Sequence, residues 1–241
     1  MPKFVEVWVY LSATPLFGLT ATLVVYVVAQ AAYTRLEQAP WANPVLWTVV
    51  FLATGLLLTG VPYPTYFAGA QFIHFLLGPA VVALGWPLWQ RRAELRQRWG
   101  RLLIAALAGG VTASGSALLM GWAFSLPSEV TLSLVPKSVT APVAMGIAEQ
   151  IGGIPALAAV FAVMTGLVGA LSGKYLFNAL RIPTDSAGWA ARGFALGTAA
   201  HGIGAARALH VDADAGAYAG LALGLQVVLA SALLPLAFKL F

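Results

Sequence analysis

The sequence predicts an all-α, polytopic transmembrane protein. Hydrophobic residues make up 60% of its 241 residues, charged residues make up only 9%, and the mean hydropathy is +0.86. A water-soluble domain of this length does not reach such values, whereas a bundle of membrane-spanning helices does. We therefore expect one integral membrane domain over residues 1–241, with about seven spans plus broken or re-entrant helices.

The expected spans follow from apolar runs long enough to cross a bilayer, separated by polar or proline-containing stretches. The first run is too long for the hydrophobic core of a signal peptide, so we expect it to be a transmembrane helix. The sixth run, rich in Gly and Ala, has an alternative as a re-entrant segment. In chain order the runs are residues 4–29, 44–60, 67–89, 102–124, 156–177, 192–209 and 215–238.

The basic residues indicate an orientation. Five of the 13 Lys and Arg residues lie in the loop Arg91–Arg101, which holds a single acid, Glu94. The positive-inside rule places this loop in the cytoplasm and the N-terminus outside. The C-terminus is then inside if residues 192–209 span the membrane and outside if they re-enter. Because this placement accounts for the basic charge, we expect no nucleic-acid partner.

One segment, Ser133–Pro155, concentrates polar residues at membrane depth, where they are costly and mark function. Pro136 ends an incoming helix, and Ser138 and Thr140 offer capping hydroxyls to a helix expected over residues 141–151.

That expected helix ends at Gly152 and Gly153, and Pro155 opens the next one. About 20 residues are needed to cross the hydrocarbon, and a helix of 11 residues is too short for that. We therefore expect it to be a broken or re-entrant helix. The N-terminus of such a helix can hold an anion, and Lys137 lies at that end.

The candidate site residues combine cations, hydroxyls and proton carriers. For binding a carboxylate we expect Lys137 and Arg207, although each has an alternative at the level of the lipid headgroups. For moving a proton we expect a buried Glu149, or His201, although each has an alternative as a structural contact. The substrate-binding set is Lys137, Ser138, Thr140, Arg207 and Gln71, and the proton-coupling set is Glu149, His201 and His74.

Two polar segments also suggest an internal repeat. Residues 66–79 and 193–207 each place a His four or five residues after a Gly, a pattern that fits the inverted repeats of secondary transporters.

Three motifs resemble a known family. Residues 136–161 (PKSVTAPVAMGIAEQIGGIPALAAVF), residues 191–209 (ARGFALGTAAHGIGAARAL) and residues 66–84 (YFAGAQFIHFLLGPAVVAL) closely resemble the LrgB/CidB membrane proteins. The plastidial glycolate/glycerate translocator of plants carries a similar domain. The resemblance implies a multi-pass protein of the bacterial inner membrane, often accompanied by a smaller LrgA/CidA-type membrane protein.

The resemblance implies two functions. One is a secondary carrier of small monocarboxylates such as glycolate, glycerate, pyruvate or lactate, which we expect to be proton-coupled. The alternative is a holin- or antiholin-like regulator of murein hydrolase activity and lysis. The sequence carries no catalytic motif and no cofactor or metal signature, so we expect neither an enzyme nor a cofactor. Glycine-rich helix faces suggest internal packing or a homodimer.

Overall fold

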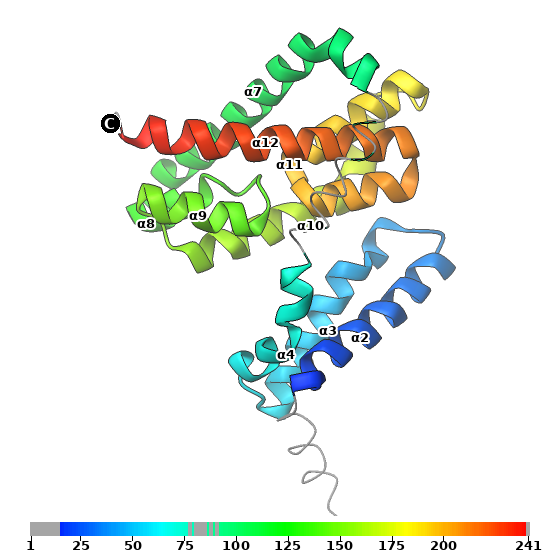
Figure 1. The fold of residues 1–241 in the computed structure, drawn as a ribbon, viewed down its shortest axis with the longest axis vertical. Coiled ribbons are helices and arrows are strands. Elements are labelled where there is room, and N and C mark those ends of the chain that lie inside the picture. Colours follow the sequence, from blue (N-terminus) through cyan, green and yellow to red (C-terminus); the bar gives the residue numbers. More distant parts are fainter. Residues whose placement is uncertain (1–14, 77–78, 80–85, 87–88, 90–91, 240–241) are drawn as a thin grey trace, which may run out of the picture. The chain divides into compact units, whose positions relative to one another are not determined.

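The computed structural model describes residues 15–76, 79, 86, 89 and 92–239, and within these ranges the chain forms helices and turns with no strand (Figure 1). The expected all-α membrane fold is confirmed. Four of the described helices are long and apolar enough to cross a membrane, namely Leu16–Arg35, Arg96–Ala123, Pro155–Ala179 and Ala213–Lys239. The chain divides into two compact units, residues 1–83 and 84–241.

The first unit contains α2 (Pro15–Arg35), a short 3-10 turn (Pro40–Ala42), α3 (Pro44–Thr59) and α4 (Tyr63–Phe75). Asn43 caps α3, because its side-chain oxygen accepts hydrogen bonds from the backbone N–H groups of the next turn. Gly60 ends α3 in the left-handed conformation.

Helices α2 and α4 pack closely because Gly18 leaves room for the backbone of Tyr66. The hydroxyl groups of Thr22 and Tyr66 lie 2.7 Å apart across the same contact. The expected spans 4–29 and 67–89 lie in part outside the described residues.

The second unit contains α7 (Arg92–Ala123), α8 (Ser128–Leu134), α9 (Ala141–Ile151), α10 (Pro155–Ala179), α11 (Ser186–Val211) and α12 (Ala213–Lys239). The expectation of a loop over Arg91–Arg101 was wrong for its described part. From Arg92 onward the arginine segment is the first part of α7, whose 32 residues extend well beyond the ~20 needed for a span.

Helices α8 and α9 form a hairpin whose tip is residues 135–140 (Figure 1). Ser133, near the end of α8, joins α8 to the segment that follows α9: its hydroxyl accepts a hydrogen bond of 2.7 Å from the backbone N–H of Ile154 and donates one of 2.6 Å to the carbonyl of Glu129. The prediction for α9 is confirmed at both ends: Thr140 is its N-cap, and Gly152 ends it in the left-handed conformation. The hydroxyl of Thr140 makes no capping bond, however.

Helix α11 is a second hairpin, because its backbone reverses at His201 (φ 41°, ψ −132°). Gly193 and Gly197 in its first arm pack against Ala215 and Ala219 of α12, so that arm and α12 run in the same direction. Residues 202–211 must therefore run the opposite way.

The packing of the second arm agrees with this reversal. Gly204 lies against Leu196 and Ala200 of the first arm, eight and four residues back along the chain. Both α11 and α12 begin at one end of the unit, where the hydroxyl of Ser186 donates a 3.1 Å hydrogen bond to Asp214. The expectation that residues 192–209 span the membrane was wrong. The structure has the alternative, a segment that folds back on itself.

The two hairpins give the second unit an inverted repeat. Helix α7 is followed by the α8–α9 hairpin, and α10 is followed by the α11 hairpin, which enters from the opposite end. Thr198, just before the tip of α11, packs against Gly109 of α7, and the tip of the α8–α9 hairpin contacts Ala113 on the same helix. The tips therefore meet about halfway along the unit, as the broken helices of secondary transporters do.

Candidate functional site

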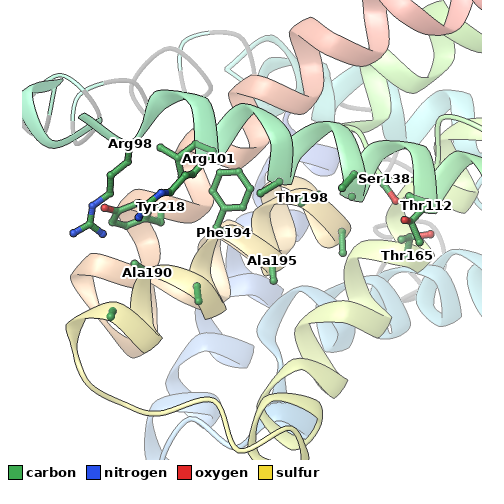
Figure 2. A pocket seen from close by; sticks show the side chains of 18 of the residues that line it. Arg98, Arg101, Thr112, Ser138, Thr165, Ala190, Phe194, Ala195, Thr198 and Tyr218 are labelled. Carbon is green, nitrogen blue, oxygen red and sulfur yellow. The ribbon is translucent and has the colours of Figure 1, made fainter. Parts of the chain in front are cut away.

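The second unit contains a cavity of about 900 Å³ between α7, α10, α11 and the tip of the α8–α9 hairpin. Figure 2 shows Arg98, Arg101 and Tyr218 at one end of this cavity and Thr112, Thr165 and Ser138 toward the other. Along α7, Arg98 and Thr112 are separated by about 21 Å, at 1.5 Å per residue. The cavity thus leads from a basic end of the unit to the tips of its hairpins.

Lys137 lines the inner end of this cavity. Its ammonium nitrogen donates a 2.7 Å hydrogen bond to the carbonyl oxygen of Ala113. Ala113 lies about 15 Å from the end of α7 at Ala123, which is half the hydrocarbon thickness of a bilayer. Lys137 is therefore a cation near the middle of the membrane.

An ammonium group at this depth needs compensation for its lost hydration. Within the described part of the chain no carboxylate forms an ion pair with Lys137, and its hydrogen bond goes to a neutral carbonyl. An ammonium has three N–H donors, so Lys137 can still bind an anion in the cavity.

Hydroxyl groups surround the same end of the cavity. Ser138 follows Lys137 on the hairpin tip, and three helices each add one threonine: Thr112 from α7, Thr165 from α10 and Thr198 from α11. Thr198 is buried, and its hydroxyl oxygen has no hydrogen-bond partner among the described residues. These hydroxyls can donate hydrogen bonds to a carboxylate or hydroxyl of a small ligand.

The basic end of the cavity is lined by Arg98 and Arg101, both exposed, with the aromatic rings of Phe194 and Tyr218 beside them (Figure 2). Fixed positive charge at the mouth of a low-dielectric cleft raises the local concentration of anions. The arrangement attracts anions at the mouth and has hydrogen-bond donors for them inside.

The structure brings together two of the predicted substrate-binding residues, Lys137 and Ser138. Thr140 begins α9 and does not line the cavity, and Arg207 is buried in the second arm of α11, also away from the cavity lining. Gln71 is exposed on α4, in the first unit. The binding roles of these three residues stay predictions.

The predicted proton carriers belong to three different helices. The expectation that Glu149 is buried was wrong, since it is exposed on the last turn of α9. His74 belongs to α4 in the first unit. His201 is buried at the reversal of α11, where its Nε2 atom lies 2.7 Å from the carbonyl oxygen of Ala162 on α10. Their roles in proton coupling stay predictions.

The residues that make up the rest of the cavity were not predicted from the sequence. Arg98 and Arg101 were explained by the positive-inside rule alone, and the three threonines were not considered. A signal for the threonines exists, since each is a hydroxyl within an otherwise apolar run: Thr112, Thr165 and Thr198.

Comparison with known proteins decides the family. The chain matches the LrgB-like family over residues 22–240. The chain belongs to the LrgB-like family. This confirms the resemblance on which the sequence analysis relied.

The relatives of this LrgB-like chain include proteins of several bacteria. Holin-like protein CidB of Staphylococcus aureus (strain N315) is 30% identical, covering 91% of this chain and 94% of the relative. Uncharacterized protein YxaC of Bacillus subtilis (strain 168) is 33% identical over the same shares of the two chains. An uncharacterized protein of Haemophilus influenzae is 34% identical over 82% of this chain and 84% of the relative. No solved structure matches the chain.

Proposed function

We propose that this LrgB-like protein is a secondary carrier for small carboxylates, with Lys137 as the group that binds the carboxylate. The observation that carries the proposal is the position of Lys137, a cation at mid-membrane depth that lines a 900 Å³ cavity without a carboxylate partner among the described residues. A bound carboxylate supplies the missing negative charge, and Ser138 beside it supplies a hydrogen-bond donor.

The inverted repeat supports a carrier over a simple pore. In secondary transporters, broken helices meet near the midplane at the substrate site, and access alternates between the two sides as the repeats move. The α8–α9 hairpin and α11 meet in this way. A pore formed by oligomerisation has no need of a lysine held at a hairpin tip.

The proposal includes an orientation and a coupling ion. The positive-inside rule places the arginine end of the cavity on the cytoplasmic side of a bacterial membrane. In this structure the cavity would then open toward the cytoplasm. His201, a member of the predicted proton-coupling set, is buried beside the hairpin tips, and we assign proton coupling to it.

A second function is favoured by the relatives. The name of holin-like protein CidB supports a holin- or antiholin-like role, and the comparisons favour this role over transport of a particular substrate. Under this alternative the protein regulates murein hydrolase activity and lysis, with an LrgA/CidA-type protein as partner. The cavity and its lysine are then structural.

Uptake by proteoliposomes distinguishes the two functions. The purified protein is reconstituted, and entry of radiolabelled glycolate, pyruvate and lactate is measured with and without a pH gradient. A carrier gives saturable uptake that the gradient stimulates and that other carboxylates inhibit. Unsaturable leakage of unrelated solutes of several sizes contradicts the carrier and supports the holin-like role.

A further inference from the structure

A second basic surface lies on the outer face of α7, the side turned away from the cavity. Eight α7 residues line the cavity and share one face of the helix: Arg98, Arg101, Leu102, Ala105, Ala108, Gly109, Thr112 and Ala113. At 100° per residue, Arg96 lies about 170° from the centre of that face, and Arg92 and Trp99 both lie to one side of Arg96, about 40° and 60° from it around the helix. The arginine cluster is therefore divided between two opposite faces.

The outer face has its own hollow, lined by Arg92, Ala93, Arg96 and Gln97. Both arginines are exposed and lie one turn apart, about 6 Å along the helix. The guanidinium of Arg92 lies over the ring of Trp89 at 4.7 Å and donates a 3.0 Å hydrogen bond to the carbonyl of the same residue. This contact directs one of the two cations and adds an aromatic ring to the patch.

Exposed tryptophans accompany these arginines. Trp86 and Trp89 precede α7 and are 64% and 62% exposed, while Trp99 is 48% exposed on the same face as Arg92 and Arg96. Tryptophan concentrates at the boundary between headgroups and hydrocarbon, where its ring is half in each environment. The apolar part of α7 follows immediately, so this patch lies at the level of the lipid headgroups.

From this geometry we infer that Arg92 and Arg96 form a binding site for the phosphate headgroup of an anionic phospholipid. A pair of guanidinium groups one turn apart matches the bidentate recognition of phosphate, and the tryptophans place the site at the depth where that phosphate lies. Clusters of arginine directly beside a membrane span bind anionic headgroups in this way. The site is separate from the carboxylate cavity and does not depend on the proposed function.

A pair of double variants tests the site. Arg92→Gln/Arg96→Gln removes the outer charges, and Arg98→Gln/Arg101→Gln removes two charges from the opposite face of the same helix. The binding of phosphatidylglycerol to the protein in detergent micelles is measured by native mass spectrometry, with phosphatidylcholine as the neutral lipid and free glycerol phosphate as the soluble headgroup.

The outer variant is expected to bind phosphatidylglycerol about 30-fold more weakly than the wild-type protein, from the contribution of two arginines at an anionic surface. The inner variant keeps wild-type lipid binding, and free glycerol phosphate does not compete at equal concentration. Equal loss in both variants, or unchanged binding in the outer variant, overturns the site. Full competition by glycerol phosphate overturns its assignment to a lipid.

Discussion

Lys137→Gln tests the cavity most sharply, because the substitution removes the charge and keeps an N–H donor near the carbonyl of Ala113. A hydrogen bond from an ammonium to a carboxylate contributes about 1.5–3 kcal/mol, so its loss weakens carboxylate binding about 10- to 150-fold. Removing a cation from membrane depth also removes a burial cost, and we therefore expect the fold to stay intact.

The assay is the initial rate of carboxylate uptake by proteoliposomes as a function of substrate concentration. We expect KM to rise 10- to 150-fold in Lys137→Gln, because the lost contact binds the substrate before it moves. Lys174→Gln is the matched control, since Lys174 is exposed near the end of α10 and does not line the cavity. A folded Lys137→Gln protein whose KM stays within about twofold of the wild type would refute the role of this lysine.

Three further predictions concern the hairpins and are read from thermal unfolding in detergent. Gly197→Ala places a methyl group against the carbonyl of Ala219 and should destabilise the protein by about 1–3 kcal/mol, the cost of overpacking, whereas the methyl group of Gly224→Ala meets open space and should not destabilise it. Equal stabilities of the two variants would contradict the packing of α11 on α12. His201→Gly relieves the unfavourable backbone conformation at residue 201 and His201→Ala does not, so the Gly variant should unfold at the higher temperature. A higher unfolding temperature for the Ala variant would contradict the change of chain direction at this residue. Ser133→Ala leaves the N–H of Ile154 without its partner and should cost about 1–3 kcal/mol, whereas Ser172→Ala, at an exposed serine that bonds only its own helix, should cost less. No difference between the two variants would contradict the hydrogen bond that joins α8 to the segment after α9.

The sequence predicted α9 to the residue because proline and glycine fix its ends. Pro142 fits the first turn, and Gly152 can adopt the left-handed conformation that ends the helix. That residues 192–209 fold back was predicted only as an alternative, and the position of the reversal at His201 was not predicted, since a His in a positive-φ conformation has no sequence signature of its own. That conformation depends on packing against α10 and α12, which are distant contacts.

The candidate site was predicted in part for a similar reason. Lys137 and Ser138 stood out because a charge beside a helix break in an apolar chain is unusual. Thr198 did not, because a lone threonine in a helix usually bonds its own backbone. Its place in the cavity follows from the approach of α11 to Gly109 of α7, which periodicity does not reveal.

The central claim is that the cavity binds small carboxylates, and thiol labelling tests it directly. The chain has no cysteine, so Ala195→Cys introduces a single thiol, at a position that lines the cavity and is exposed to it. Leu180→Cys, at the exposed end of α10, is the control outside the cavity.

Labelling rates with a membrane-impermeant anionic thiol reagent are measured with and without a carboxylate such as glycolate, pyruvate or lactate. We expect at least one of these carboxylates to slow the labelling of Ala195→Cys but not of Leu180→Cys, and Lys137→Gln to remove the protection. Labelling of Ala195→Cys that no carboxylate changes, and that is as fast with a cationic reagent, would contradict an anion site in the cavity.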